Sequence, residues 1–370
     1  MTELAQSSHE GPVAGDRVIV AMSGGVDSSL AAALMAARGC EVVGITMQLS
    51  GSASRCCSMT DAEDARSVAD ELGIRFFVAN YAERFRSEVI EFFADSYLAG
   101  RTPIPCVVCN SRFKFDHLLE RTQVLGSQWL ATGHYARIDR DPATGGLRLR
   151  RAADRDRDQT YFLFQLDQGQ LSRACFPVGE MTKAEVRAKA RSLRLATADK
   201  PTSQELCFVP DGNYVEVIEE IRPHARDLEG EIVDEEGHVL GRHAGIHHFT
   251  VGQRHGLGVQ RGQPLYVTRI EADGQRVVVG GVESLDCRGA DVEEVNWIAG
   301  EVPRQTLRAD VQVRHRHQPA AASVEPDSRG GARIVFDEPV RAVTPGQAAV
   351  FYQGDSVLGG GWIARGLREV

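Results

Sequence analysis

The stretch Val18-Ile-Val-Ala-Met-Ser-Gly-Gly-Val-Asp-Ser-Ser29 constrains the fold more than any other part of this chain. Its apolar run breaks at a glycine pair and continues into an alanine-rich pattern, which predicts a buried strand, a turn and the start of a helix. Gly24 and Gly25 lack Cβ atoms, so the backbone there can approach a ligand closely. Because free amides at a helix N-terminus attract anions, the loop is predicted to bind a phosphate group.

The loop lacks the G-x-x-x-x-G-K-[ST] pattern, and no lysine lies near it in the sequence, which disfavours transfer of a γ-phosphate. The string Ser23-Gly-Gly-Val-Asp-Ser28 instead resembles the loop of the ATP pyrophosphatase (PP-loop) superfamily. Members of that superfamily attach AMP to a substrate oxygen and release pyrophosphate. The resemblance implies ATP as substrate and Mg²⁺ as its companion ion. Asp27 either orients the loop or helps to hold the ion, and the sequence leaves both roles open.

Length and composition narrow the class of protein. At 370 residues the chain is long enough for two or three cores. A net charge of −9 argues against a uniformly basic nucleic-acid binder, although a local basic face remains compatible with it. The first sixteen residues are polar and no apolar stretch reaches the length of a membrane span, so we expect a cytoplasmic protein without membrane contact. In that reducing setting the eight cysteines are expected to be catalytic, metal-binding or unpaired.

The first half of the chain alternates between predicted strands and helices. After the glycine loop, strands are predicted at Glu41–Met47, Ile74–Val78 and Trp129–Thr132, with helical patterns between them. This alternation predicts an α/β fold with a doubly wound parallel sheet. Ligands of such sheets bind beyond the carboxyl ends of the strands, where the glycine loop, Met47 and Gly133-His134 are expected to meet.

From about Gly230 the pattern changes to short β-branched runs separated by glycine, which predicts two small β-rich domains, each a barrel or a sandwich. We therefore expect a catalytic domain over residues 14–212, a small central domain over 213–281 and a C-terminal barrel over 282–370. His247-His248 in the central domain has no third metal ligand nearby in the sequence, and we interpret the pair as structural.

Two cysteine neighbourhoods are flanked by turn and polar residues rather than by an apolar period. Cys106 and Cys109 follow two prolines in Gly100–Asn110, and Cys207 lies in the polar stretch Lys200–Phe208. The Cys-x-x-Cys spacing of the first pair also suits a metal or redox site. Cys56-Cys57 is open to a zinc or redox role or to a plain loop. The remaining three cysteines, Cys40, Cys175 and Cys287, are interpreted as packing residues.

With these motifs in place, the chain from Arg17 to nearly its C-terminus resembles the family of bacterial tRNA 2-thiouridylases. Those enzymes replace oxygen by sulfur at C2 of the wobble uridine. Several long motifs occur in one order, which makes the resemblance specific. They are Ala21–Ser28, Thr-Pro-x-Pro-x-x-x-Cys-Asn ending at Asn110, Ala131–Arg137, Asp158–Leu163, Ser203–Phe208, Gly252–Gly258 and Pro345–Gln347.

The resemblance implies roles for individual residues. Cys109 would be the nucleophile and Cys207 would carry sulfur as a persulfide. Members of the family often have asparagine at the place of Ile104, so the side-chain amide that could contact the target base is missing here. ATP contacts are implied for Ala21, Met22, Ser23, Gly24, Gly25, Val26, Asp27, Ser28, Met47 and Gly133, and tRNA contacts for Ile104, Pro105, Cys106, His134, Arg157, Asp158, Gln159, Arg314, His315 and Gln347.

The implied reaction explains the need for both a nucleotide loop and two thiols. A carbonyl oxygen leaves poorly, and adenylation would convert it to an AMP leaving group. A persulfide on Cys207 would supply the sulfur, and the cycle would end in a Cys109–Cys207 disulfide. The partners implied are a tRNA with a modifiable wobble uridine and either a cysteine desulfurase or a sulfur-relay protein.

Other functions remain open at this stage. A different PP-loop enzyme, such as an amide-forming synthetase, would share the loop but would not need the two cysteines. A catalytically inert tRNA-binding or sulfur-carrier protein would not need the intact loop. An iron–sulfur cluster held by Cys207 with Cys106 or Cys109 is a further, less favoured hypothesis.

Overall fold

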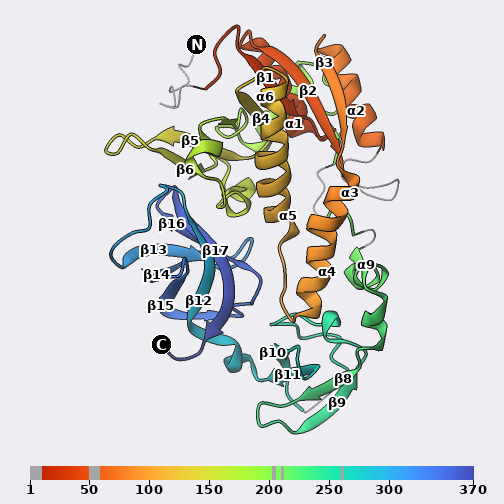
Figure 1. Ribbon diagram of the computed structural model, residues 1–370, viewed down its shortest axis with the longest axis vertical. Coiled ribbons are helices and arrows are strands. Elements are labelled where there is room, and N and C mark those ends of the chain that lie inside the picture. Colours follow the sequence, from red (N-terminus) through yellow and green to blue (C-terminus); the bar gives the residue numbers. More distant parts are fainter. Residues whose placement is uncertain (1–10, 50–58, 202–205, 210–211, 260–261) are drawn as a thin grey trace.

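A computed structural model gives the fold of the chain and describes residues 11–49, 59–201, 206–209, 212–259 and 262–370. Within these ranges the chain forms an N-terminal α/β unit, a small central unit and a C-terminal β-barrel (Figure 1). The Cys56-Cys57 pair, for which the sequence leaves both a zinc or redox role and a plain loop open, lies outside the described residues. The same holds for residues 202–205, just ahead of Cys207.

A parallel sheet forms the centre of the N-terminal unit. Its strands lie in the order β3-β2-β1-β4-β7, and all neighbouring pairs are parallel. Val18 and Val20 pack into one core and Ile19 into another, because successive side chains of a strand point to opposite faces. A sheet covered on both faces needs the continuous apolar run seen in β1. The strands are β1 (Arg17–Ala21), β2 (Glu41–Gln48), β3 (Arg75–Asn80), β4 (Trp129–Thr132) and β7 (Ala174–Cys175).

Helices cover both faces of this sheet (Figure 1). Leu30 and Val186 pack with Val18 in the first core, whereas Phe85 and Phe113 pack with Ile19 in the second. The first core is covered by α1 (Val26–Ala37), α2 (Met59–Glu71) and α8 (Lys183–Ser192). The second is covered by α3 (Ala82–Phe85), η1 (Arg86–Ile90), α4 (Glu91–Leu98), α5 (Pro105–Val108), η2 (Cys109–Leu118) and α6 (Leu119–Val124).

A hairpin of β5 (Ala136–Arg140) and β6 (Leu147–Arg151) links the N-terminal unit to the barrel. Arg150 of β6 pairs with Ser356, so the hairpin extends the sheet of the C-terminal unit. Arg137 and Arg150 both donate hydrogen bonds to Asp355, at 3.0 and 3.3 Å. Short helices follow at η3 (Arg155–Arg157), η4 (Thr160–Phe162) and α7 (Gln168–Leu171).

The central unit is a four-stranded sheet in the order β10-β11-β8-β9. Its small core contains Ile232, Ile246 and Val277. Its helices are α9 (Tyr214–Ile221), η6 (Pro223–Asp227), η7 (Ile246–His248) and η8 (Val282–Leu285), and its strands are β8 (Gly230–Val233), β9 (Val239–His243), β10 (Tyr266–Glu271) and β11 (Arg276–Gly280).

The C-terminal unit is a barrel that closes because β12 pairs with both β15 and β17. Closure leaves no free edge among its six strands. They are β12 (Asp286–Trp297), β13 (Leu307–Gln312), β14 (Ala320–Pro326), β15 (Ala332–Arg341), β16 (Ala348–Gln353) and β17 (Ser356–Leu367).

The predicted fold class, a doubly wound parallel sheet followed by two small β-rich units, is confirmed. The alanine-rich β14 and the glycine-containing β17 do not stand out in the sequence, because barrel pairing stabilises strands of weak local preference. No helix in the described part of the chain combines the length and the apolar character that crossing a membrane requires.

Candidate active site

The glycine loop joins β1 to α1 as a tight, hydrogen-bonded turn. Ser28 Oγ accepts a hydrogen bond from the Ser23 amide at 3.1 Å and donates one to the Gly25 carbonyl at 3.0 Å. Gly24 has φ +68°, and a Cβ atom there would lie 2.2 Å from the Asp61 carbonyl oxygen. The loop therefore needs glycine both for its backbone conformation and for its contact with α2.

Gly133, directly after β4, brings a second strand end against this loop. A Cβ atom on Gly133 would lie 2.6 Å from the Ser28 amide nitrogen and 2.7 Å from the Asp27 carbonyl carbon. Backbone atoms cannot move aside as a flexible side chain can, so only glycine fits. The carboxyl end of β4 is thereby packed against the first turn of α1.

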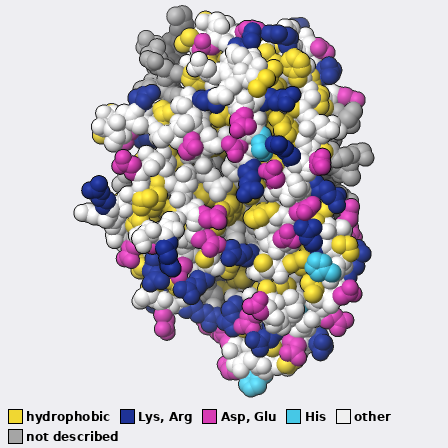
Figure 2. Space-filling model, in the orientation of Figure 1, with side chains coloured by type: hydrophobic (Ala, Val, Ile, Leu, Met, Phe, Trp, Pro, Cys, Tyr) yellow, Lys and Arg dark blue, Asp and Glu magenta, His cyan; other side chains and the backbone are white. Residues whose placement is uncertain are grey.

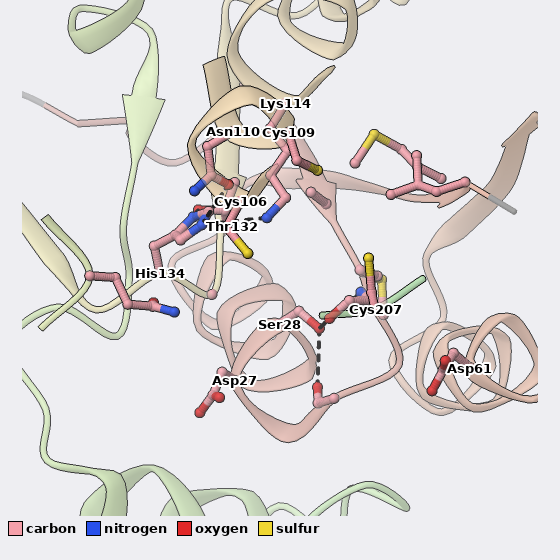
Figure 3. Close-up of a pocket in the computed structure, with 18 of the residues that line it drawn as sticks. Asp27, Ser28, Asp61, Cys106, Cys109, Asn110, Lys114, Thr132, His134 and Cys207 are labelled. Atoms are coloured by element: carbon pink, nitrogen blue, oxygen red, sulfur yellow. Dashed lines mark hydrogen bonds between the residues drawn. The ribbon is translucent and has the colours of Figure 1, made fainter. Parts of the chain in front are cut away.

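A cavity of about 360 Å³ opens at this edge of the sheet (Figure 3). The cavity is lined by every residue with a predicted ATP contact except Gly24. Gly24 instead packs against the backbone of Asp61. The first turn of α1, whose first amides have no intrahelical acceptor, borders this cavity, as anion binding requires. The predicted residues on its wall are Ala21, Met22, Ser23, Gly25, Val26, Asp27, Ser28, Met47 and Gly133.

The predicted nucleophile and persulfide carrier both line this cavity. Pro105 occupies the first turn of α5, a favoured place for proline, and the helix continues into η2 at Cys109. Cys106 and Cys109 are three residues apart on this continuous helix and thus share a face. Cys207 comes from the segment 206–209, which Phe208 anchors against Phe93 at a ring-centroid distance of 5.2 Å. The fold thus brings together cysteines far apart in sequence.

Asp27 forms the centre of an ion pair that the sequence did not indicate. Lys183 Nζ lies 2.7 Å from both carboxylate oxygens, and the Tyr135 hydroxyl donates a hydrogen bond to Oδ1 at 2.7 Å. Burial, together with the charge of Asp27, raises the pKa of Tyr135, which therefore stays protonated and keeps donating. Lys183 is the first residue of α8, after a Thr182–Glu185 capping box.

A second lysine, Lys200, holds the other carboxylate on the cavity wall. Its Nζ lies 2.7 Å from Asp61 Oδ1 and also contacts Asp64. The absence of a lysine after the glycine loop in the sequence is therefore misleading about the site. Lysines reach the cavity from α8 and from the start of the Lys200–Phe208 stretch instead.

His134 is buried on the cavity wall with a network around its ring. Thr132 Oγ1 lies 2.7 Å from Nδ1, and Asn110 Oδ1 lies 3.2 Å from Nε2. Asn110 Nδ2 donates to the Phe162 carbonyl at 3.2 Å, and Lys114 Nζ lies 3.4 Å from Nε2 of the ring. Burial and the nearby Lys114 hold the pKa of His134 well below its ordinary range. The side chain is 7% exposed, so a tRNA contact through it stays a prediction.

A second cavity of about 610 Å³ adjoins the first and shares Asp27, Pro105, Cys106 and Lys183 with it. Most of the residues with predicted tRNA contacts line it; Arg314 and His134 do not line this second cavity. Those that do are Ile104, Pro105, Cys106, Arg157, Asp158, Gln159, His315 and Gln347.

Some of these side chains also hold the structure together. Gln347 Nε2 donates to the Thr102 carbonyl at 2.9 Å, which ties the barrel to the loop before Cys106. Gln159 Oε1 accepts from the Tyr135 amide at 2.8 Å. His315 packs on the Phe162 ring with centroids 4.6 Å apart. The wall of the second cavity is thus formed jointly by the N-terminal unit and the barrel.

Metal-binding groups do not concentrate around the cysteines. Within the described ranges, the groups of three close metal-binding side chains lie in the central unit. Asp27 and Asp61 are the carboxylates on the wall of the first cavity. Mg²⁺ at a nucleotide takes one or two carboxylates together with phosphate oxygens and waters, so either side chain is suitable.

Comparison with known proteins agrees with this architecture. A family profile described as the tRNA methyl transferase HUP domain matches residues 16–211, its PRC-barrel domain matches 216–281, and an aminomethyltransferase beta-barrel domain matches 288–363.

The tRNA-specific 2-thiouridylase MnmA of Solibacter usitatus is 50% identical over 365 residues, covering 94% of this chain and 98% of the relative. That of Acidobacterium capsulatum is 50% identical over 367 residues, with the same coverage. That of Koribacter versatilis is 47% identical over 365 residues, covering 94% of this chain and 99% of the relative. At this identity over nearly its whole length, the chain belongs to the tRNA-specific 2-thiouridylase family.

Proposed function

We propose that this protein uses ATP to replace O2 of the wobble uridine of a tRNA by sulfur, which yields 2-thiouridine, AMP and pyrophosphate. The observation that carries the proposal is that Cys109, Cys207 and the Ser23–Ser28 loop line one cavity. A nucleotide loop alone would suit many ATP-dependent enzymes. A pair of thiols lining the same cavity suits sulfur transfer to the carbon whose oxygen has been adenylated.

In the first step the uridine O2 attacks the α-phosphorus of ATP, a P–O bond forms, and pyrophosphate leaves. The amides of the loop and the first turn of α1 stabilise charge on the phosphates. Lys183, placed 2.7 Å from Asp27, contributes a cation at the border of the two cavities. Asp27 or Asp61 would hold a Mg²⁺ ion, which neutralises phosphate charge when bound.

In the second step a persulfide on Cys207 provides sulfur. Either its terminal sulfur attacks C2 and expels AMP, after which Cys109 attacks Cys207 Sγ, breaks the S–S bond and releases the thiolated uridine, or Cys109 first attacks Cys207 Sγ and releases hydrosulfide, which then attacks C2 and expels AMP. Both routes form a Cys109–Cys207 disulfide, and a two-electron thiol reductant restores the thiols. Because a disulfide holds its Cα atoms about 4.4–6.8 Å apart, the segment 206–209 must be able to approach η2. A cysteine desulfurase or a sulfur-relay protein would reload Cys207.

The tRNA is proposed to bind over the second cavity, with the anticodon base turned into the first. Arg157, His315 and Gln347 line this entrance. Figure 2 shows acidic and basic side chains interspersed over one face, so the net charge of −9 is not a uniform negative coat. Contacts from Arg157 and Arg314 to phosphates would make tRNA binding weaken with salt. The functional division into residues 14–212, 213–281 and 282–370 is part of this proposal.

The direct test incubates the protein with unmodified tRNA, ATP, Mg²⁺, a cysteine desulfurase and cysteine, followed by nucleoside analysis. We expect ATP-dependent 2-thiouridine. In a parallel incubation with a methyl donor, a methylated nucleoside formed without ATP would favour the methyl transfer named in the family description and contradict the proposal. Absence of tRNA-dependent AMP together with intact tRNA binding would favour an inert binding protein.

Cysteine variants separate sulfur transfer from other ATP-dependent chemistry. Cys109→Ser and Cys207→Ser should each lower thiolation by roughly 10³-fold or more, because removal of a catalytic nucleophile has effects of this size. Both should still bind ATP and release pyrophosphate in the presence of tRNA, because adenylation precedes the sulfur step. Cys287→Ala, buried in the barrel, is the matched control and should keep full activity. A PP-loop synthetase would be unaffected by either serine variant.

The iron–sulfur alternative makes a different prediction. Protein purified without oxygen would then contain iron and show charge-transfer absorption that Cys106→Ser or Cys207→Ser removes. We expect neither iron nor this absorption.

A further inference from the structure

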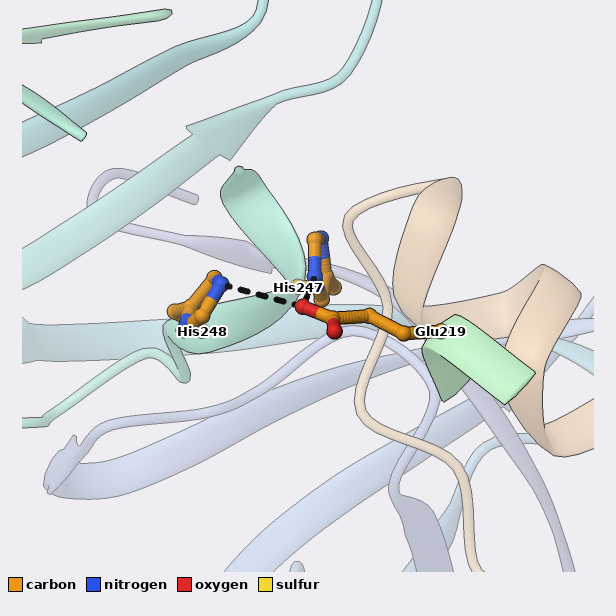
Figure 4. A group of neighbouring side chains, drawn as sticks. All are labelled: Glu219, His247 and His248. Carbon is orange, nitrogen blue, oxygen red and sulfur yellow. Dashed lines mark ion pairs between the residues drawn. The ribbon is translucent and has the colours of Figure 1, made fainter. Parts of the chain in front are cut away.

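The central unit contains a cluster of three side chains that the thiolation chemistry does not use. His247 and His248 end the short helix η7, and Glu219 reaches them from α9 (Figure 4). The local sequence around the histidine pair offers no third ligand. The fold supplies one, because α9 packs beside η7.

The spacing of the three side chains resembles that of ligands around a small cation. One carboxylate oxygen, Glu219 Oε1, lies 3.6 Å from His247 Nε2 and 3.9 Å from His248 Nε2. The ligand atoms of the three residues all lie within 4.8 Å of one another. Ligands held about 2.0–2.1 Å from a tetrahedral Zn²⁺ are about 3.3 Å apart, and the two carboxylate–imidazole distances exceed that value by about 0.3 and 0.6 Å.

His247 points into this cluster as a buried ring without a hydrogen bond. Its side chain is 0% exposed, and neither ring nitrogen has a hydrogen-bond partner among the described residues. Leaving a buried polar group unsatisfied is costly, so the ring is expected to have a ligand. Burial, followed by the charge of nearby His248, holds the pKa of His247 below its ordinary range, which favours the neutral form that binds metals.

The other parts of the cluster are held in place. Gly245 provides room for the imidazole, since a Cβ atom there would lie 2.3 Å from His247 Cε1. Arg226 Nε donates to the second carboxylate oxygen of Glu219 at 3.0 Å and leaves Oε1 directed at the rings. This hydrogen bond is the main cause that lowers the pKa of Glu219 and keeps it ionised.

We propose that Glu219, His247 and His248 form a binding site for a divalent transition metal of the zinc class. Two imidazoles and one carboxylate are a ligand set that zinc accepts, with a water molecule in the fourth position. His248 is partly exposed, so the fourth position opens to solvent. The metal fastens α9 to η7 within the central unit, and α9 also packs against α4 of the N-terminal unit. Its role is therefore to stabilise the junction of the two units.

A second group of possible ligands, Asp234, Glu236 and His238, serves as the comparison. Glu236 and His238 are exposed, and His238 Nδ1 lies 3.1 Å from Asp234, at hydrogen-bond distance. It contains no buried histidine like His247, and exposed acidic groups of this kind are common without a metal. His238 is thus a matched control: a histidine of the same unit, near carboxylates, outside the proposed site.

The test measures Zn²⁺ bound to the full-length protein after chelator treatment, reconstitution and desalting, with the affinity taken from competition against a chromogenic chelator. Glu219→Gln and His248→Gln should weaken binding by at least the ~10–100-fold that removal of outer-shell partners costs. His238→Gln should bind like the wild type. Zn²⁺ should raise the melting temperature of the wild type and His238→Gln only.

Cobalt substitution separates this site from the cysteines of the active site. Co²⁺ bound by imidazole and carboxylate absorbs weakly in the visible range and lacks the near-ultraviolet charge-transfer band of thiolate ligation. We expect the weak spectrum alone, and its loss in His248→Gln, which changes a partly exposed side chain. The proposal is overturned if Zn²⁺ does not bind, if binding is equal in Glu219→Gln and His238→Gln, or if Co²⁺ shows only the thiolate band.

Discussion

The two adjoining cavities are built in different ways. The wall of the first contains a run of consecutive residues, Ala21 to Ser28 with Gly24 set back, at the edge of the parallel sheet. The second is assembled from the proline loop, the η3 region and two segments of the barrel. A site made by one contiguous loop keeps its local geometry by hydrogen bonds such as Ser28 to Gly25. A site made by distant segments depends on how whole units pack, for example through Gln347 and Thr102.

This difference suggests that nucleotide chemistry and RNA recognition can be altered separately, except where the cavities share a wall. Asp27 and Lys183 belong to both. Substitutions in the first cavity should therefore change the ATP step, those in the second the affinity for tRNA, and those at the shared wall both.

The largest effect is expected for Gly133→Ala. The new methyl group would lie 2.6 Å from the Ser28 amide nitrogen. Overpacking of this kind costs about 1–3 kcal/mol, so kcat/KM for ATP should fall by up to roughly 100-fold. Gly146→Ala is the control, because its methyl group meets only side chains, at 3.5 Å or more. Initial rates of tRNA-dependent AMP formation measure the effect. A changed Kd for tRNA with an unchanged ATP step would show that the cavities are not separable.

Lys183→Gln tests the shared wall. Of the Asp27 partners described above, only the Tyr135 hydroxyl then remains. Because the Lys183–Asp27 ion pair is partly buried, breaking it should lower AMP formation by about tenfold, which is less than the effect of breaking a fully buried pair. Affinity for tRNA should fall as well, which fluorescence anisotropy with labelled tRNA measures. Lys183→Arg keeps the charge and should recover part of both. If only one of the two readouts changes, the pair belongs to one cavity alone.

His315→Ala tests the second cavity. Loss of a ring that can stack with a base should raise the Kd for tRNA by about 5–10-fold, at the lower end of the ~1–3 kcal/mol per stacked base. The KM for ATP should stay unchanged, and His238→Ala should behave as the wild type. An unchanged Kd would leave the ring with only its contact to Phe162.

The smallest effect concerns pH. An unfolded histidine has a pKa of about 6.5, and the pKa of folded His134 is well below this, so the unfolded state binds the proton first. The stability contributed by neutral His134 is therefore complete above about pH 6.5, the pKa of the unfolded histidine. It is lost as the pH falls from there toward the pKa of the folded histidine, by at most about 1.4 kcal/mol per pH unit. Urea unfolding at about pH 7.5 and about pH 5.5 should show a smaller acid loss in His134→Asn than in the wild type. Equal losses would contradict a neutral buried ring.

Much of the fold and part of the site could be predicted from local pattern. The strand, turn and helix around Gly24 follow from apolar periodicity and glycine, and the polar surroundings of Cys109 and Cys207 single out both. Lys183, Lys200 and Tyr135 carry no such signal, since the capping box before Lys183 predicts only a helix start. Their role arises when α8 and the end of β4 pack against the glycine loop.

The sequence by itself predicted the strand, turn and helix around the glycine loop and the polar setting of the two thiols, because each depends on neighbours within a few residues. Only the tertiary structure decided which charges meet: Lys183 at Asp27, Lys200 at Asp61, and Glu219 at the histidine pair. Coulomb attraction and metal ligation act over a few ångströms in space regardless of separation along the chain, so only packing can bring such partners together.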